Sequence, residues 1–141
     1  MLIPDSNVLV HAANEDAREY AASRNWLLDA LRGREPVGLA WSTILAFVRL
    51  STHPRIFSPP LTAERSIALV KSWLSAPAGV LIEPTVRHLT LLHGLLHDVG
   101  VAGNLVNDAH LAALALEHDA TVISFDRDFA RFEGVRWRMP A

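Results

Sequence analysis

Four aspartates of this sequence lie where their carboxylates could gather into one reactive cluster. Asp5 directly follows the first apolar segment of the chain, and Asp126 and Asp128 come just after a later one, residues 121–124. Asp108 lies near the start of a segment rich in Ala and Leu. Apolar residues this close on both sides of an acid are unusual in a surface loop, and they are typical of a site at the end of a buried strand.

Such a cluster opposes its own assembly, because like charges repel. Two carboxylates about 4 Å apart repel by roughly 4 kcal/mol at an effective dielectric constant near 20. Either the acids share a proton or a cation neutralises them. Oxygen ligands without His or Cys favour the hard ions Mg²⁺ and Mn²⁺. Such an ion can make a bound water nucleophilic and stabilise charge on phosphoryl oxygens, which is the chemistry of phosphodiester hydrolysis.

Each aspartate also has an ordinary structural explanation. Asp5 could cap a helix, and Asp108 could be a solvated helix residue. Asp126 and Asp128 could form a turn in which a side chain accepts a backbone N–H. Each explanation stays open for its own residue, but it is less plausible that all of them hold at once.

Short apolar segments alternate with helical patterns along the chain, and this alternation predicts the fold. It predicts an α/β fold, a three-layer α/β/α sandwich with a central parallel sheet of four to five strands. Sites in such sheets gather at the carboxyl ends of strands, which is where the predicted strands would place Asp5 and Asp126. We expect strands at 2–4, 37–40, 80–82, 121–124 and 135–137, and helices at 7–13, 16–31, 44–50, 62–74, 85–97 and 104–118.

Residues suited to capping mark several of the predicted helix boundaries. Asp16 could cap the second helix, which Gly33 would end. Ser42 or Thr43 could cap the third helix, and Thr62 resembles the start of the fourth.

Length and composition are those of one ordinary domain, residues 1–141, with half of its residues hydrophobic. The absence of cysteine excludes disulfides, thiolate metal sites and a Cys nucleophile. We expect a soluble cytoplasmic protein with no membrane partner, since no apolar run approaches the roughly 18 residues that span a bilayer. The net charge of −2 excludes a strongly basic nucleic-acid-binding surface.

Local positive charge could still bind a substrate phosphate. All basic residues except Lys71 are arginines, which can bind phosphate through two parallel hydrogen bonds. The candidates for phosphate contact lie where the third predicted helix passes into the proline-rich loop 53–61, and they are Arg49, His53 and Arg55. A solvated helix end explains them equally well.

Histidines and tryptophans have simpler expected places. The spacing of His93 and His97 matches a metal pair, but we expect these two and His88 on a solvated face. The buried stripe of this helix is marked instead by Leu89, Leu92, Leu96 and Val99. His110 should point away from Asp108. Three tryptophans should lie in the core rather than stack on bases: Trp26, Trp41 and Trp73.

Three motifs in order resemble the PIN-domain ribonucleases, and most of all the VapC toxins of bacterial toxin–antitoxin pairs. They are Asp5-Ser6-Asn7 after an apolar strand, the segment NDAHLAALA, and the segment VISFDRDF. The resemblance covers essentially the whole chain, including WSTILAFVRLSTHPRIF in the middle and VRWRMP at the end. Each motif alone is weak, but three at this spacing are fairly specific.

The resemblance implies roles for individual residues. Asp5 matches the first metal-binding acid, Asp108 the acid of the ND motif, and Asp126 the acid of the T/S-x-D motif. These three would hold the metal ion. Ser124 occupies the hydroxyl position of the last motif, and Asp128 matches a further acid that often follows it.

By the same resemblance, the protein would be a Mg²⁺-dependent endoribonuclease, with Mn²⁺ as a possible substitute. All four aspartates would be catalytic, with Asp128 helping Asp126 to orient or activate the attacking water. Asn7, Ser124 and Asn104 would hold the ligands by hydrogen bonds. The substrate would be a structured cellular RNA such as tRNA or rRNA. A cognate VapB-like antitoxin would occlude the site, and the protein would form a homodimer.

The sequence departs from the PIN pattern in one place. PIN domains usually carry a Glu in the helix after the second strand, and Ala46 stands where we expect that acid. No acidic residue lies between Glu35 and Glu64. The site therefore has one carboxylate fewer, for which water or Asp128 could substitute. The departure leaves an alternative open, a catalytically weakened PIN-fold module that binds RNA or protein.

Two other acid-cluster classes fit less well. A haloacid-dehalogenase phosphatase needs a second Asp two residues after the nucleophile, where this chain has Asn7. It also needs a catalytic Lys, and Lys71 lies in an ordinary amphipathic segment. A response-regulator receiver needs paired acids after its first strand and a Lys after a late one.

Overall fold

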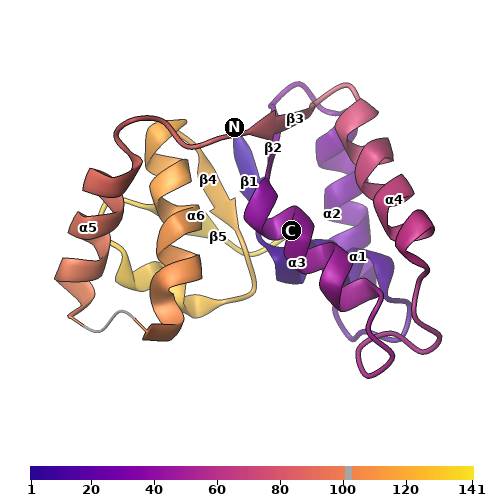
Figure 1. The fold of residues 1–141 in the computed structure, drawn as a ribbon. Helices are drawn as coiled ribbons and strands as arrows, with labels where there is room; N and C mark the ends of the chain where they lie inside the picture. Colours follow the sequence, from indigo (N-terminus) through magenta and orange to yellow (C-terminus); the bar gives the residue numbers. More distant parts are fainter. Residues whose placement is uncertain (101–102) are drawn as a thin grey trace.

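Five parallel strands form the centre of the protein in a computed structural model that describes residues 1–100 and 103–141 (Figure 1). The sheet has the strand order β3-β2-β1-β4-β5, so the first strand lies in the middle. Every neighbouring pair of strands is parallel. The strands are β1 (Leu2–Pro4), β2 (Val37–Ala40), β3 (Gly79–Ile82), β4 (Thr121–Ile123) and β5 (Arg136–Arg138).

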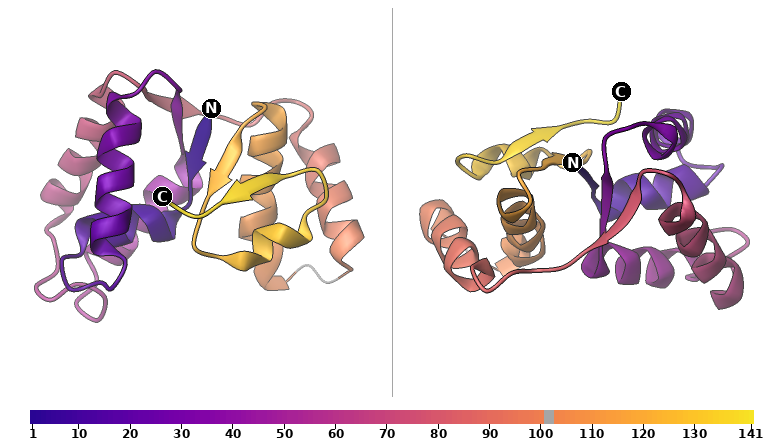
Figure 2. Two further views of the ribbon diagram at one scale, coloured as in Figure 1. Left: turned by 180° about the vertical axis from the view of Figure 1, so that it is seen from behind. Right: turned by 90° about the horizontal axis from the view of Figure 1, so that it is seen from above.

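Helices cover both faces of this sheet, which confirms the predicted three-layer α/β/α fold (Figure 2). One face packs against α1 (Ser6–Ala13), α2 (Tyr20–Arg32), α3 (Trp41–Ser51) and α4 (Ala63–Ser75). The other packs against α5 (His88–Val99), α6 (Val106–Glu117) and the 3₁₀ helices η1 (Gly103–Leu105) and η2 (Arg127–Arg131).

The pleat of the strands divides the apolar side chains between two cores. Leu2 and Leu39 point into the core beneath α1 to α4, whereas Ile3 and Ala40 point into the core beneath α5 and α6. Successive strand residues face opposite sides of a sheet, so a strand buried on both faces has apolar residues throughout. This is why the short segments of the sequence look continuously apolar.

Most predicted elements are confirmed to within a few residues, and the exceptions lie at helix starts. Thr62 caps α4 as predicted, because its hydroxyl accepts a hydrogen bond from the N–H of Arg65 at 3.1 Å. Asp16 was a wrong prediction, since α2 begins only at Tyr20. The predicted caps of the third helix, Ser42 or Thr43, were also wrong, because both residues lie inside α3. α3 begins earlier, and the Thr43 hydroxyl donates to the carbonyl of Ala40 at 2.9 Å.

Two of the three tryptophans lie where expected, and the third does not. Trp26 and Trp73 are 8% and 6% exposed, in the core beneath α1 to α4. Trp41 is 49% exposed, so its predicted core position was wrong. It begins α3 directly after β2, and its indole therefore lies at the margin of the core rather than inside it.

His88 also differs from its prediction. It is buried, and a chain of hydrogen bonds through it joins α5 to α6, whereas the sequence suggested a solvated face. His88 Nδ1 lies 2.9 Å from a carboxylate oxygen of Glu117, and His88 Nε2 lies 2.8 Å from His110 Nδ1. The backbone N–H and hydroxyl of Thr85 donate to the other Glu117 oxygen at 3.0 and 2.6 Å. His110 therefore turns away from Asp108, as predicted.

Within residues 1–100 and 103–141, no helix combines the length and the apolar character needed to cross a membrane.

A candidate metal centre at the carboxyl edge of the sheet

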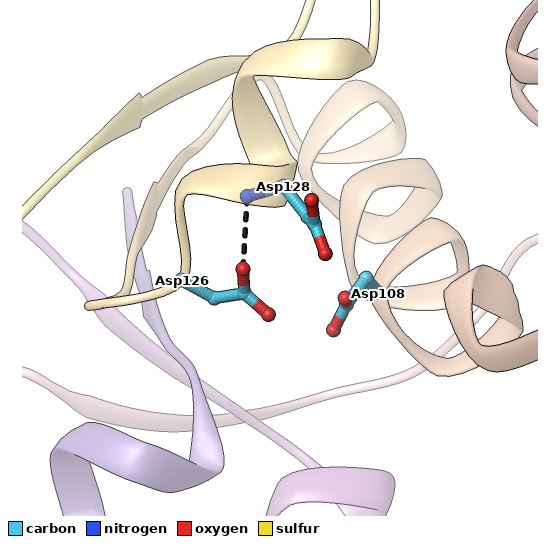
Figure 3. Close-up of side chains that lie close together, drawn as sticks. All are labelled: Asp108, Asp126 and Asp128. Carbon is cyan, nitrogen blue, oxygen red and sulfur yellow. Dashed lines mark hydrogen bonds between the residues drawn. The ribbon is translucent and has the colours of Figure 1, made fainter.

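Four aspartates lie around one site beyond the carboxyl ends of β1 and β4, and three of them, without Asp5, form the tightest group. Asp5 and Asp126 each follow a strand, and Asp108 lies in the first turn of α6. These three line one open cleft of about 630 Å³. Asp108, Asp126 and Asp128 each offer a carboxylate oxygen, and these oxygens all lie within 4.8 Å of one another (Figure 3).

Asp5 is held in place by four donors. One of its oxygens accepts hydrogen bonds from the backbone N–H of Ser6, at 2.7 Å, and from the Ser6 hydroxyl. The other accepts the hydroxyl of Ser124 at 2.7 Å and the side-chain amide of Asn7 at 3.1 Å. Its backbone N–H donates to the carbonyl of Ile123 at 2.8 Å. Asp5 thus caps α1, but the same contacts also fix its carboxylate at the edge of the cleft.

Ser124 connects the two halves of the site. Its side chain is fully buried, and its hydroxyl donates to Asp5. The same oxygen accepts the amide of Asn7 at 3.0 Å and the backbone N–H of Asp126 at 2.9 Å. Asn7 in turn accepts the N–H of Phe125 at 3.3 Å. A single hydroxyl therefore orients the carboxylate after β1 and the chain that carries the carboxylates after β4.

Asp126 and Asp128 form the turn that was their alternative explanation. One oxygen of Asp126 accepts the backbone N–H of Asp128 at 2.8 Å and caps η2. Asp128 is half-exposed and lies 3.9 Å from Arg131. The turn does not use up these groups, because a carboxylate offers about four acceptor positions on its two oxygens. Figure 3 shows the carboxylates of Asp126, Asp128 and Asp108 directed toward one another.

The electrostatics of the cleft favour either a proton or a cation. Burial is the largest cause that raises the pKa of Asp108, the negative charges of Asp5, Asp126 and Asp128 raise it too, and together they bring it to about 7. Burial also raises the pKa of Asp5, despite hydrogen bonds from Ser124 and Ser6 that lower it, and the charge of Asp126 adds to the increase. Clustered oxygens that resist ionisation in this way fit a hard divalent cation such as Mg²⁺.

The sequence comparisons agree with this geometry. The PIN domain profile matches residues 2–135. The chain is 52% identical over 140 residues to "Ribonuclease VapC37" of Mycobacterium tuberculosis, a match that covers 99% of this chain and 97% of the relative. This chain belongs to the VapC family of PIN-domain proteins. The PIN domain is also 43% identical over 140 residues to "VapC ribonuclease Mb2897" of Mycobacterium bovis, covering 99% of this chain and 95% of that one.

Solved structures have the same fold. The PIN domain matches VapBC2 from Rickettsia felis, solved bound to a promoter DNA fragment, with a TM-score of 0.70 and 18% identity over 98% of this chain and 97% of that one. It matches Mycobacterium tuberculosis VapC20, described as a sarcin-ricin loop cleaving toxin, with a TM-score of 0.69 and 13% identity over 96% of this chain and 99% of that one.

The cleft of the PIN domain contains two of the three remaining predicted residues. Asn104 and Arg49 both line it. Arg55 does not line the cleft and lies exposed in the segment 53–61. Its backbone N–H donates a hydrogen bond to Nδ1 of His53 at 3.1 Å. The two arginines are close in the sequence, but only Arg49 lines the cleft that contains the acids.

The lining of the cleft of the PIN domain also includes Ser42, Ala46 and Asn107. Asn107 was not among the predicted site residues, although it directly precedes Asp108 in the ND motif. Ala46 lies in the cleft wall, and it stands where the resemblance to PIN domains led us to expect an acid. The cleft itself therefore has one carboxylate fewer than the PIN pattern.

Proposed function

We propose that this protein is a Mg²⁺-dependent endoribonuclease that acts as the toxin of a toxin–antitoxin pair. The observation that carries the proposal is the gathering of Asp108, Asp126 and Asp128 within 4.8 Å, in and beside a cleft that Asp5 also lines. Membership of the VapC family supports the choice of RNA as the substrate, because the related proteins are named ribonucleases.

Mg²⁺, or Mn²⁺ in its place, would be held by Asp5, Asp108 and Asp126, and when bound it supplies charge stabilisation at the phosphoryl oxygens. Asp128 is half-exposed and lies next to this group, so its carboxylate can orient the attacking water and accept its proton. Ser124 and Asn7 keep the Asp5 carboxylate aimed at the cleft.

The substrate would be a structured cellular RNA, such as a loop of tRNA or rRNA. Arg49 lines the cleft and can bind a phosphate next to the one that is cut. Arg55 lies outside the cleft lining, so any contact it makes would be with a more distant part of the RNA. Because the net charge of the chain is −2, local arginines rather than overall charge must attract the substrate.

The partner would be a VapB-like antitoxin, and several structural neighbours are toxin–antitoxin assemblies. A groove of about 500 Å³ between α2 and α4 suits part of such a partner. It is lined by apolar side chains that include Leu27, Leu31 and Leu69, together with three arginines. An apolar antitoxin segment with acidic flanks is complementary to this lining.

We also expect a homodimer, which light scattering of the purified protein would test.

A second function has one specific observation in its favour. Ala46 removes a carboxylate from the cleft wall, and a PIN fold with a weakened metal site could bind RNA or protein without cutting it. The mutual repulsion of the remaining acids argues against this alternative. The pKa of Asp108 is raised to about 7, by burial first and then by the charges of the neighbouring acids, and a surface that only binds RNA or protein gains nothing from this cost.

The decisive experiment is cleavage of a total RNA pool by antitoxin-free protein with Mg²⁺, with Mn²⁺ and with EDTA. We expect discrete fragments that require the metal and disappear in Asp5→Asn and Asp108→Asn. Asp29→Asn makes the same change of charge on the exposed face of α2 and should cut like the wild type. Folded wild-type protein that binds RNA but leaves it intact with both metals would favour the binding module instead.

A further inference from the structure

Trp41 and Leu45 are exposed apolar residues that the proposed metal site does not explain. Trp41 is 49% exposed and Leu45 is 62% exposed, both on α3. A Trp side chain gains much from burial, since it can remove about 150–250 Å² from water. Both other tryptophans of this half of the protein, Trp26 and Trp73, are almost fully buried. A half-exposed indole beside a catalytic cleft therefore suggests a ligand.

The two residues belong to a stripe along α3 that leads to Arg49. Residues four apart lie on one side of a helix, so Trp41, Leu45 and Arg49 follow one another over about 12 Å. Leu45 and Arg49 both line the cleft that contains Asp5 and Asp108. Trp41 thus lies one turn before the cleft lining, in line with it. The stripe has an aromatic ring at one end, an aliphatic side chain in the middle and a guanidinium at the other end.

The cleft has two chemically different walls. The carboxylates come from the start of α1, from α6 and from the segment after β4. The α3 wall has no acid, because none lies between Glu35 and Glu64, and Ala46 is small and neutral. A phosphate can therefore approach along α3 without repulsion from that wall, while a cation is bound at the other.

We propose that Trp41 is a base-stacking residue for an unpaired nucleotide of the RNA that enters this cleft. The inference rests on the proposed RNA substrate and adds the part of the protein that holds it. The indole would stack on the base, Leu45 would contact the neighbouring sugar or base, and Arg49 would bind a phosphate. Stacking on an aromatic side chain tolerates any base, but the base must first leave its own stack, so duplex RNA cannot use this contact.

Binding measured in EDTA tests the inference without cleavage. The probes are a fluorescein-labelled single-stranded RNA of about 15 nucleotides with mixed sequence, and the same strand in a blunt duplex. We expect Trp41→Ala to weaken single-strand binding about tenfold and to leave duplex binding unchanged. Trp41→Phe should retain most of the affinity. Ile67→Ala, which removes a 44% exposed side chain from α4, should bind like the wild type.

Intrinsic fluorescence gives a readout that a merely structural role would not change. Bound single-stranded RNA should quench the fluorescence of Trp41, so Trp41→Phe should keep its affinity and lose most of the quenching. Trp26 and Trp73 are buried, and the indole N–H of Trp137 donates to the carbonyl of Ser124 at 3.0 Å, so these three should respond little.

Two results would overturn the inference. One is unchanged single-strand affinity and quenching in Trp41→Ala. The other is a fall in molar mass of Trp41→Ala by light scattering at the same concentration, since the indole would then lie between two copies of the chain. The proposed nuclease fails separately. If the wild type never cuts RNA with Mg²⁺ or Mn²⁺ but Trp41→Ala still loses single-strand binding, the stacking residue stands and the enzyme does not.

Discussion

The hydroxyl of Ser124 donates to Oδ2 of Asp5 across 2.7 Å and so links the ends of two neighbouring strands. The link depends on the register of the sheet, in which Pro4 of β1 lies opposite Ile123 of β4. The next residue of each strand then faces the other at the carboxyl edge. Because Ser124 is fully buried and also accepts the N–H of Asp126, it sets the relative position of two proposed metal ligands.

Ser124→Ala should damage the metal site more than it damages the fold. It removes one of the four donors to Asp5 and leaves the N–H of Asp126 without its acceptor. Loss of a group that orients a ligand typically lowers metal affinity about 10–100-fold. We expect a loss of about 1–3 kcal/mol in the free energy of unfolding. Mn²⁺ titration by calorimetry and urea unfolding would measure the two effects. Ser124→Thr keeps the hydroxyl and should restore Mn²⁺ affinity; if it binds as weakly as Ser124→Ala, the hydroxyl is not what orients the site.

Asp108→Asn should stabilise the metal-free protein above about pH 4. The folded state raises the pKa of this carboxyl from 3.8 to about 7, so the folded protein holds the proton more tightly than the unfolded chain. Ionisation therefore destabilises the wild type progressively as pH rises from about 4 to about 7, and the cost stays constant above that. We expect the variant to be more stable by about 2 kcal/mol at pH 8, since partial exposure screens the charges.

Urea unfolding of both proteins between pH 4 and pH 8 in EDTA checks this prediction. Adding Mg²⁺ should then stabilise the wild type and not Asp108→Asn, because only a ligand that binds the folded state raises its stability. If the free energy of unfolding of the two proteins changed with pH in the same way, the pKa of Asp108 would not be raised by folding.

Ala46→Glu should restore a carboxylate to the cleft wall. Because Ala46 lines the same cleft as Asp5 and Asp108, an added acid should increase the affinity for Mn²⁺, by about tenfold. It should also lower the stability of the metal-free protein at neutral pH, since it adds another like charge. Calorimetric titration with Mn²⁺ is the measurement. Ala46→Gln has the same size without the charge, and equal affinity in both variants would show that the Glu carboxylate does not reach the metal.

Glu117→Gln should weaken the joint between α5 and α6. Burial raises the pKa of Glu117, but hydrogen bonds from Thr85 and His88 outweigh it, and the net pKa lies below the ordinary value of 4.5. The carboxylate therefore stabilises the fold above that value, and this contribution is lost as pH falls through the lower folded pKa. We expect the variant to lose about 1–3 kcal/mol at pH 7, because the charged hydrogen bonds are replaced by weaker ones.

Urea unfolding at pH 7 and at successively lower pH measures the difference, which should shrink in acid as the wild type loses the same contribution. Glu133→Gln changes an exposed acid and should leave stability unchanged at both ends of the range. A difference between wild type and Glu117→Gln that persists in strong acid would show that shape rather than charge holds the joint.

Local sequence was sufficient to place two of the acids. Asp5 and Asp126 each follow an apolar strand, and in a parallel sheet the carboxyl ends of all strands lie on one edge. The apolar strands themselves are visible because both faces of the sheet are buried, so every residue of β1 must be apolar. These two residues therefore lie at the same edge of the sheet whatever the order of the strands.

The partners of each acid depend on the tertiary structure. Asp108 meets Asp126 and Asp128 only because α6 packs beside β4, a contact between segments with no local signal for each other. Arg49 and Arg55 looked equivalent along the chain, and only the direction of α3 separates them. The pattern of apolar residues reports which segments are buried, whereas helix packing decides which side chains meet.

The exposed indole of Trp41 and the buried ring of His88 show the same division. By itself the sequence determined the α/β class, the position of the strands and the carboxylates that follow them, because these depend on residue type and on periods of two and 3.6. Only the tertiary structure decided that Trp41 lies beside the cleft and that His88 bonds to Glu117. Burial at a helix end depends on what packs against it, and that neighbour comes from a distant part of the chain.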